Sequence, residues 1–440
     1  MGLRATLVLA GLVAAAAVRA EVVPDGDYRG AGACASPNCH GSVTARADSR
    51  WVLQNEYATW RSCDRHASSY AVLHEPRSLS IARRLGMTEE PWRADKCLDC
   101  HALNVPDRPD GPRLTDGVSC ETCHGPSGLW IKEHTEKGWH EHTAEERKQL
   151  HMTNTMDPSV AAGTCLECHF GSPRKTVDHA MIAAGHPALV FELDSFAANM
   201  PPHWKLHPDN AHWFDGGAWA AGQAVALREA ANALRRQRRE AWPEFSQYDC
   251  FTCHHQLSPS GARPLRGVGG HPPFDASRWL GVEPLASVVD AEHARLLRQN
   301  AVRFQQLAAQ GQRGESVEPV AAAMQATANQ VLSRSEGGAL HEGEIDALLR
   351  DLTAPGKPPP GFRGAQETAW SLAALASARS WIQWKAGQPA PPVQGCPVAP
   401  PETDGLQGAI NQLFLDLRDP ATYDPPRFAQ DVAAVRRLLD

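Results

Sequence analysis

The sequence has no long apolar run beyond its first twenty residues and no excess of positive charge. Its 440 residues carry 43 Lys and Arg against 50 Asp and Glu, which gives a formal net charge of −7 at pH 7. A negatively charged chain lacks the basic surface that attracts nucleic acid. A membrane-spanning helix needs about 20 consecutive apolar residues, and no later segment offers them. The sequence therefore predicts neither a nucleic-acid partner nor a transmembrane span.

The first twenty residues contain an apolar run from Ala5 to Val18, which an arginine precedes and a small-residue site ending at Ala20 follows. This run is too short for a membrane span, and its flanks are those of a secretory signal peptide. We expect residues 1–20 to be removed and the mature protein to start near Glu21. Loss of two arginines moves the formal charge from −7 to −9. The sequence thus predicts a periplasmic or secreted protein.

No segment alternates apolar and polar residues in the way that a half-buried strand requires. Helical periodicity occurs instead: Ala220, Leu227 and Leu234 share one face of a helix predicted over 218–240, which Pro243 ends. Further helices are predicted at 285–310, 316–334, 342–352, 364–386, 403–417 and 426–439, with Pro-rich joints at 354–361 and 388–402. These patterns predict a mainly α fold.

The cysteines are concentrated before residue 256, and Cys396 is the single one after it. Eight of them form four C-x-x-C-H motifs, which are Cys97, Cys100 and His101; Cys120, Cys123 and His124; Cys165, Cys168 and His169; and Cys250, Cys253 and His254. This motif attaches c-type haem: two thiols bond to the porphyrin and the histidine ligates the iron. Paired C-x-x-C units also bind zinc, but zinc gives no reason for a histidine after every pair. The motifs therefore predict covalently bound haem c.

A fifth pair of cysteines, in "ACASPNCHGS", departs from this spacing. Four residues separate Cys34 from Cys39, where the motif has two, and His40 follows directly. The segment is either a haem site with two extra residues between the thiols or a pair of cysteines that form a disulfide or stay unused. The spacing alone leaves both alternatives open.

Several stretches match a known family in the residues around the cysteines as well. They are "ACASPNCHGSV", "GVSCETCHGPSGLWIKEH", "VDHAMIAAGHPALVFELDSF" and "YDCFTCHHQL". Over residues 30–260 the chain resembles multihaem c-type cytochromes related to the cytochrome c-554-like tetrahaem electron acceptor of hydroxylamine oxidoreductase. The resemblance implies that Cys34, Cys39 and His40 hold a fifth haem. It also implies a multihaem cytochrome c domain over 21–260 that transports electrons.

Of the 20 histidines, five would serve as proximal iron ligands, which leaves fifteen. The cytochromes that the chain resembles close most of their irons with a second imidazole. By that resemblance the candidates are His66, His134, His179, His186 and His203. Each is also compatible with a surface or core histidine, and one of the five methionines between Met87 and Met200 would compete at a single site.

Two cysteines fall outside all five sites. Cys63 and Cys396 either form a disulfide in an oxidising compartment, tying the tail to the haem region, or Cys63 is simply buried. The helices after residue 280 are predicted to form a separate C-terminal domain over 280–440. That segment contains no cluster of titratable residues suggestive of a catalytic site, so we expect it to serve docking or packing.

The predicted functions differ in whether one iron keeps an open position. In the first, all irons are closed and the protein transfers electrons between a donor and an acceptor protein, and a basic partner would match the negative charge. The second is a small-molecule oxidoreductase that acts on nitrogen or sulfur oxyanions at one five-coordinate haem, and the third is a structural or sensory module centred on the tail. Related nitrite and hydroxylamine enzymes use C-x-x-C-K or a haem-linked tyrosine, but this chain has no C-x-x-C-K and only five tyrosines. The sequence therefore favours a carrier over an enzyme.

Overall fold

The computed structural model describes residues 27–46, 48, 52–106, 111–204, 213–236, 244–255, 272–275, 277, 280–309, 317–336, 340–357, 361–385 and 405–440. Within these residues the regular structure is helical, and Tyr248 and Phe274 form an isolated β-bridge. The prediction of a mainly α fold is confirmed. The predicted signal peptide lies outside the described residues. No described helix is long and apolar enough to cross a membrane.

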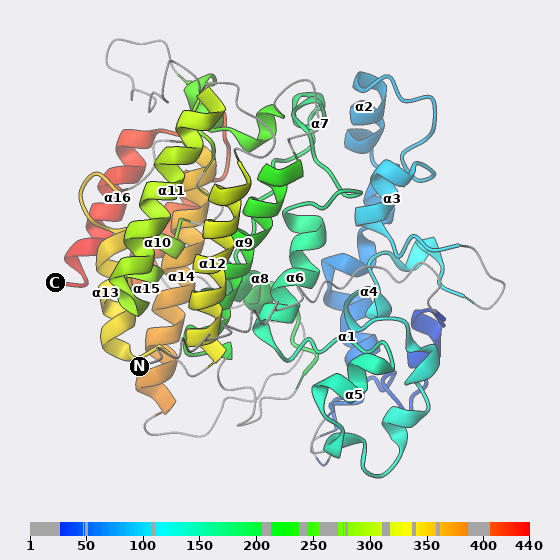
Figure 1. The fold of residues 1–440 in the computed structure, drawn as a ribbon. Coiled ribbons are helices and arrows are strands. Elements are labelled where there is room, and N and C mark those ends of the chain that lie inside the picture. Colours follow the sequence, from blue (N-terminus) through cyan, green and yellow to red (C-terminus); the bar gives the residue numbers. More distant parts are fainter. Residues whose placement is uncertain are drawn as a thin grey trace, which may run out of the picture.

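The N-terminal part consists of short helices joined by loops, drawn from blue and cyan at the right of Figure 1 to green nearer its centre. Its helices include η1 (Ala31–Cys34), α1 (Glu56–Cys63), η2 (Arg65–Ser68), α2 (Pro76–Arg84), α3 (Asp95–His101), α4 (Cys120–His124), α5 (Ala144–Gln149), α6 (Pro158–His169), α7 (His179–Ala184) and α8 (Leu193–Asn199). The described residues before α6 form two small apolar clusters, one around Trp60 and one around Leu98. A region with so little apolar burial needs a further apolar component to complete its core.

The C-terminal part is a bundle of longer helices. They are α9 (Gly217–Arg236), α10 (Val282–Val289), α11 (Ala291–Ala309), α12 (Glu318–Glu336), α13 (Glu342–Leu352), α14 (Phe362–Lys385), α15 (Gly405–Asp416) and α16 (Pro425–Arg437). Each stretch predicted to be helical is helical, but 285–310 holds two helices. The break falls at Asp290, whose carboxylate accepts hydrogen bonds from the Glu292 amide (2.9 Å) and from His293 Nδ1 (2.9 Å) and so caps α11.

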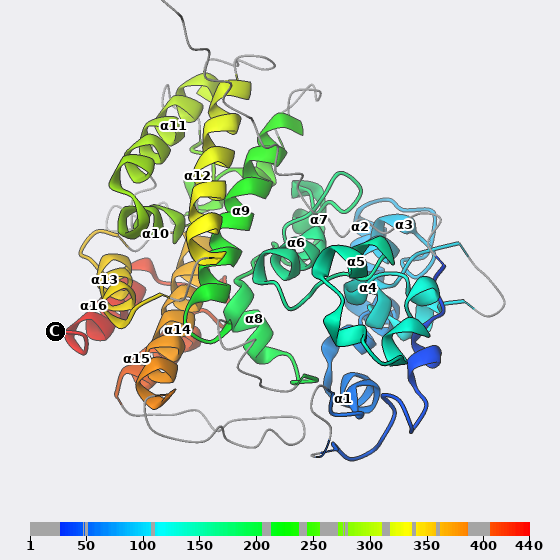
Figure 2. The ribbon, with the colours of Figure 1, turned by 60° about the horizontal axis from the view of Figure 1, so that its bottom comes forward.

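The bundle contains two hydrophobic clusters, and the larger one continues into α6 and α8 of the N-terminal part. Helix α9 packs against α12, α6 and α8, and the core includes Leu166 of α6, Trp219 of α9 and Leu372 of α14. Figure 2 shows α6 and α8 between the bundle and the short N-terminal helices. Helix α9 precedes residue 260 and yet shares a core with helices after residue 280. The division into domains at 21–260 and 280–440 remains a prediction.

The start of α10 lies directly against α9. The Gly281 amide donates to Gln223 Oε1 (3.0 Å), and a Cβ added at Gly281 would lie 2.5 Å from Cζ2 of Trp219. The Trp219 side chain is fully buried. The close approach of these two helices therefore depends on the absence of a side chain at Gly281.

Cys63 is disulfide-bonded, whereas the ten cysteines of the five predicted haem sites are free. The alternative in which Cys63 is an unpaired buried thiol is therefore wrong. Its predicted partner, Cys396, lies outside the described residues, so the pairing of these two cysteines remains a prediction.

Candidate haem sites

Five candidate sites are numbered in chain order. They are site 1 (Cys34, Cys39, His40), site 2 (Cys97, Cys100, His101), site 3 (Cys120, Cys123, His124), site 4 (Cys165, Cys168, His169) and site 5 (Cys250, Cys253, His254). The motifs of sites 2, 3 and 4 end helices α3, α4 and α6, and that of site 5 begins at the 3-10 helix η11 (Cys250–Thr252). Residues three apart share one face of a helix, so both thiols of a motif point to the same side.

Site 1 accommodates its two extra residues in a tight turn. The amides of Cys39 (2.8 Å) and Gly41 (2.9 Å) both donate to the carbonyl of Ser36, and a Cβ at Gly41 would lie 1.9 Å from a backbone oxygen. The His40 amide donates to the Cys34 carbonyl (3.3 Å), and the His254 amide donates to the Cys250 carbonyl (2.8 Å) in site 5. In both sites the amide of the motif histidine thus donates to the carbonyl of the first cysteine, although the segment of site 1 is two residues longer.

Eight of the ten histidines predicted as iron ligands lie in pairs, each pair uniting one motif histidine with one of the second set. The distances between ring centres are 6.2 Å for His40 and His134, 6.5 Å for His101 and His186, 6.2 Å for His169 and His66, and 6.4 Å for His254 and His179. The ring planes range from nearly parallel for His40 and His134 (11°) to perpendicular for His66 and His169 (90°). The two rings of each pair are thus neighbours, with a gap of 6.2 to 6.5 Å between their centres.

This gap fits an iron atom held between two imidazoles. A nitrogen ligand lies about 2 Å from a first-row metal, and the ring centre lies roughly 1 Å behind the nitrogen, so the centres of two opposed rings lie about 6 Å apart. The four measured separations, 6.2 to 6.5 Å, agree with this value. The residues present at sites 1, 2, 4 and 5 thus fit a haem iron with two histidine ligands.

Hydrogen bonds at Nδ1 fix the orientation of most of these rings. The acceptors are Glu56 Oε2 for His40 (2.9 Å), Asp64 Oδ1 for His66 (3.0 Å), and the carbonyls of Ser69 for His101 (2.9 Å), Trp130 for His134 (3.1 Å), Pro187 for His186 (2.8 Å) and Pro201 for His203 (3.2 Å). A histidine that ligates a metal characteristically donates its other ring nitrogen to a carboxylate or carbonyl. Each of these six rings therefore keeps Nε2 free for a metal.

Two carboxylates accept hydrogen bonds both from a histidine ring nitrogen and from backbone amides. Glu56 Oε1 accepts from the amide of Leu53 (2.6 Å), and Asp64 Oδ1 accepts from the amide of His66 (2.9 Å). Burial raises the pKa of both carboxyls, but the hydrogen bonds from the histidines and amides outweigh it and lower the pKa overall. Both groups are therefore anionic when they orient His40 and His66.

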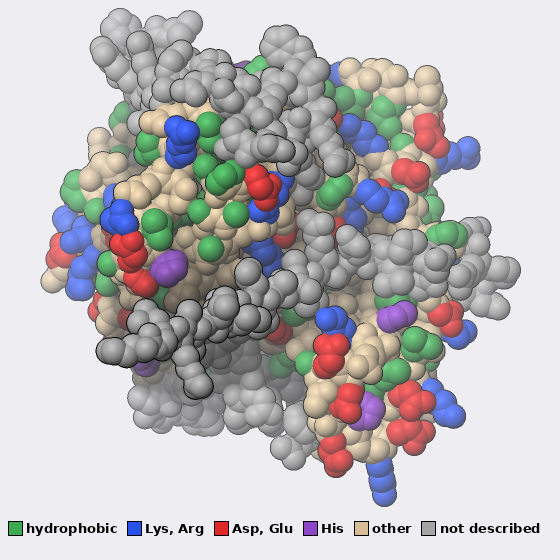
Figure 3. All heavy atoms as spheres, in the orientation of Figure 1, with side chains coloured by type: hydrophobic (Ala, Val, Ile, Leu, Met, Phe, Trp, Pro, Cys, Tyr) green, Lys and Arg blue, Asp and Glu red, His purple; other side chains and the backbone are tan. Residues whose placement is uncertain are grey.

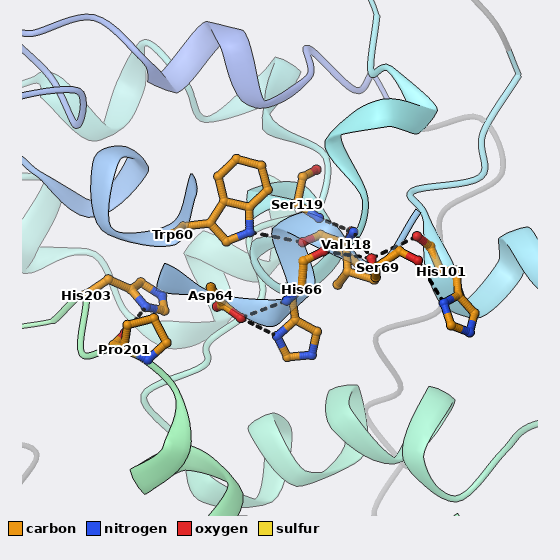
Figure 4. A network of polar contacts seen from close by, with 10 residues as sticks. Trp60, Asp64, His66, Ser69, His101, Val118, Ser119, Pro201 and His203 are labelled. Atoms are coloured by element: carbon orange, nitrogen blue, oxygen red, sulfur yellow. Dashed lines mark hydrogen bonds and ion pairs between the residues drawn. The ribbon is translucent and has the colours of Figure 1, made fainter. Parts of the chain in front are cut away.

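A polar network joins three of the sites, as Figure 4 shows. Ser69 Oγ lies within hydrogen-bond distance of the carbonyls of His66 (2.7 Å) and His101 (2.8 Å), and it accepts from the Val118 amide (3.0 Å). The indole of Trp60 donates to the Val118 carbonyl (3.1 Å), just before the motif of site 3. This network thus connects three features: His66, the candidate second ligand of site 4; His101, the motif histidine of site 2; and Val118, which lies two residues before the motif of site 3.

Site 3 differs from the other four. Burial, together with the neighbouring charges of His203 and His40, lowers the pKa of His124 to about 4. His203 therefore lies near His124, but the structure forms no close ring pair between these two described residues. A ring with so low a pKa is neutral at pH 7, and its nitrogen lone pair is available to a metal.

Contacts between thiols place the sites next to one another. The thiol of Cys34 in site 1 is hydrogen-bonded to that of Cys120 in site 3, and this bond lowers the pKa of Cys34. The thiol of Cys100 in site 2 is hydrogen-bonded to that of Cys168 in site 4, and this bond raises the pKa of Cys100. Cys123 of site 3 interacts electrostatically with Cys168. Sites 1, 3, 4 and 2 are therefore neighbours in that order.

Site 5 adjoins site 2 through helix α7. His179, which pairs with His254, begins this helix, and His186, which pairs with His101, follows the C-cap residue Gly185. Asp178 caps the helix by accepting from the Met181 amide (2.8 Å), and Lys96 near the motif of site 2 pairs with Asp178 (2.9 Å). One short helix and the two residues after it thus carry candidate ligands for two sites.

The sequence did not reveal Glu56, Asp64 or Ser69 as parts of the sites. Asp64 stands two residues before His66, and aspartate readily accepts hydrogen bonds from amides at this spacing. The sequence therefore contained a local indication that Asp64 binds His66. Nothing local marks Glu56 or Ser69. No group of three or more His, Cys, Asp or Glu in the described part of the chain is arranged to hold a metal ion.

Residues 33–125 match the sequence model of the family described as cytochrome c554 and c-prime. The match contains sites 1, 2 and 3. No curated protein and no solved structure shows significant similarity to the chain. The match supports a c-type cytochrome that binds haem c and takes part in electron transfer. In this part of the chain, the protein resembles the c-type cytochromes of the c554 and c-prime family.

Proposed function

We propose that the protein is a periplasmic multihaem cytochrome that passes electrons between redox partner proteins through five closely packed haems. The observation that carries this proposal is the pairing of eight histidines at 6.2 to 6.5 Å. Haem c, when bound, supplies an iron that alternates between the ferric and ferrous states. The predicted signal peptide and the covalent attachment motifs support export to the periplasm.

Each site receives two side-chain ligands in this proposal. The motif histidines His40, His101, His124, His169 and His254 bind one face of their irons, and His134, His186, His203, His66 and His179 bind the other, in that order. The ten cysteines of the five sites form the thioether bonds. Two imidazole ligands leave no position for a substrate, which supports a carrier rather than an enzyme.

The thiol contacts support an electron path that does not follow the sequence. The path runs from site 1 through sites 3, 4 and 2 to site 5, because neighbouring thiols or one shared helix link these sites in that order. The exposed cysteines are Cys39 in site 1 and Cys250 and Cys253 in site 5, whereas the other seven free thiols are less exposed. Electrons would therefore enter and leave at sites 1 and 5.

The surface beside site 1 supports a basic partner there. In residues 132–148, which include His134, the exposed charged side chains are five glutamates and three lysines, a net charge of −2. Figure 3 shows acidic side chains gathered over this region, at the lower right of the view. Complementary charge would steer a positively charged donor or acceptor towards site 1, and this attraction would weaken as salt is raised.

Intact mass spectrometry of the exported protein tests the number of haems. We expect five haem increments in the wild type and four in Cys39→Ala, because loss of one thiol of site 1 leaves sites 2 to 5 complete. Four increments in the wild type would show that site 1 is empty.

A second candidate function rests on site 3. His203 lacks the close ring approach to His124 that the other four pairs have, so an iron at site 3 would keep an open position for a small nitrogen or sulfur species. Carbon monoxide titration of the reduced protein and electron paramagnetic resonance of the oxidised protein separate the two functions. A carrier binds no carbon monoxide and is entirely low-spin, whereas one carbon monoxide per chain and a high-spin signal would favour the oxidoreductase.

A further inference from the structure

A buried arginine of the bundle lies beside site 5. Arg363 is at the start of α14 and is 6% exposed. Its Nη1 donates to Asp275 Oδ2 and to the carbonyl of Ser246 (3.0 Å). The neighbouring Gly361 lies against the motif, since a Cβ added there would be 3.1 Å from Cβ of Phe251. Arg363 is also close enough to Cys250 for a thiolate there to raise the arginine pKa, an effect that burial opposes.

The rest of the guanidinium has no partner. Nε and Nη2 of Arg363 are buried and form no hydrogen bond. A buried charged donor that is left unsatisfied is costly, because the group has lost its water without gaining another acceptor. Two nitrogens of an arginine present parallel donors that match the two oxygens of a carboxylate.

The nearby described carboxylates do not reach these two nitrogens. Asp275 is bound to Nη1, and Asp249 accepts from the Phe251 amide (3.0 Å) and the Thr252 hydroxyl (3.4 Å). Glu367, one turn along α14, accepts from the Phe191 amide (3.3 Å) through Oε1, and its buried Oε2 forms no hydrogen bond with Arg363. Among the described residues, Nε and Nη2 are thus left without an acceptor.

We propose that Arg363 binds a haem propionate and thereby joins the C-terminal bundle to the redox centres. This inference rests on the proposed function, because it requires haem at the sites. The propionate comes from the haem of site 5, which lies beside Arg363, or from that of site 4, whose His169 ring contacts Phe191 (5.2 Å between ring centres). In either case the guanidinium charge stabilises the more negative ferrous haem and raises its reduction potential.

The test compares Arg363→Gln with Arg379→Gln by redox titration followed with optical and electron paramagnetic resonance spectra. Arg379 is a matched control because it lies on the same helix and pairs with Asp346 (2.9 Å). In Arg363→Gln we expect the ratio of reduced to oxidised haem at a fixed potential to fall about tenfold for one haem, which is about 59 mV for a one-electron couple. In Arg379→Gln every potential stays unchanged.

Two further variants complete the design. The double variant Arg363→Gln/Asp275→Asn removes both charges of the buried pair, so it replaces the single variant if that fails to fold. We expect a smaller fall in potential, because loss of the Asp275 charge acts in the opposite direction. The Cys250→Ala/Cys253→Ala variant lacks the haem of site 5, and Arg363→Gln is then added to it. If this addition shifts no reduction potential, the propionate belongs to the haem of site 5. If one potential still shifts, the propionate belongs to the haem of site 4.

The outcomes separate this inference from the proposed function. Five haem increments with unchanged potentials in both Arg363 variants would overturn the propionate contact and leave the cytochrome intact. A wild-type protein without the predicted haems would instead refute the proposed function itself.

Discussion

Glu56 and Asp64 are the two carboxylates that accept hydrogen bonds from ring nitrogens at the candidate haem sites. The other four oriented rings donate to backbone carbonyls. An anionic acceptor increases the electron density on the imidazole, which favours ferric over ferrous iron. We therefore expect sites 1 and 4, which contain His40 and His66, to have lower reduction potentials than a carbonyl-bonded pair would give.

Replacing Glu56 with glutamine tests this expectation. The amide oxygen can still accept a hydrogen bond, so the fold is retained while the negative charge is lost. We expect the potential of one haem to rise, by roughly 59 mV if the redox equilibrium changes tenfold. Redox titration of Glu145→Gln serves as the control, because Glu145 is an exposed partner of Lys148 (3.7 Å) and touches no ligand. A potential that does not change in Glu56→Gln would mean that the carboxylate only positions the ring.

The candidate ligands could be named from the sequence because each stands in a local pattern, either a motif or a stretch that the family resemblance covers. The groups that hold them could not. Ser69 acts through a carbonyl 32 residues away, at His101, and Arg363 reaches Ser246 across 117 residues. Such contacts depend on how distant segments meet, and neither periodicity nor spacing contains that information.

Among the structural elements, α8 begins with a buried carboxylate. Glu192 accepts from the amides of Asp194 (2.9 Å) and Ser195 (2.8 Å), and burial raises its pKa from 4.5 to about 7. The folded protein thus keeps a proton that the unfolded chain has lost. The stability that this proton contributes is complete below about pH 4.5 and is lost as the pH rises through 7.

The variant Glu192→Gln should remove this pH dependence. A change in pKa from 4.5 to about 7 corresponds to about 3 kcal/mol of unfolding free energy. Between pH 5 and pH 8 we expect the wild type to lose about 2–3 kcal/mol relative to the variant, measured by denaturant unfolding at both pH values. Glu145→Gln should follow the wild type. Parallel curves for wild type and Glu192→Gln would show that Glu192 is ionised throughout.

The contact between α9 and α10 gives a second prediction for the elements. In Gly281→Ala the new methyl group would overlap the buried ring of Trp219, which must shift. Overpacking of this kind costs about 1–3 kcal/mol, so we expect a lower melting temperature with unchanged haem content. Gly343→Ala on α13 is the control, because a Cβ there meets nothing within 4 Å. Equal stability of the two variants would contradict the described approach of α10 to α9.

The helices of the bundle were predictable because their apolar residues repeat at helical spacing, as in Ala220 and Leu227. Their arrangement was not. An amphipathic pattern shows that a face is buried but does not show which helix covers it, so the packing of α9 against α12 emerged only from the structure. The break at Asp290 was missed because the periodicity continues across it.

At the scale of the whole molecule, the two parts differ in how they are stabilised. The bundle buries large side chains such as Trp219, Leu372 and Phe428, whereas the described residues before α6 form only small clusters. We expect protein made without haem to keep slow amide hydrogen exchange in α9 to α16 and to exchange rapidly in 27–157. Mass-spectrometric hydrogen exchange of haem-free and exported protein measures this. Strong protection of 27–157 without haem would show that this part folds by itself.

The placement of ligands for two sites at the two ends of α7 has a consequence for how the molecule would fill with electrons. His179 begins the helix and His186 follows its last residue by two positions, so this short segment would hold two redox centres close together. An electron on one centre repels an electron arriving at the other, and the repulsion is strong where little water screens it. Reduction of these two sites would then be anticooperative, and the two potentials measured in a titration would belong to the pair and to neither site alone.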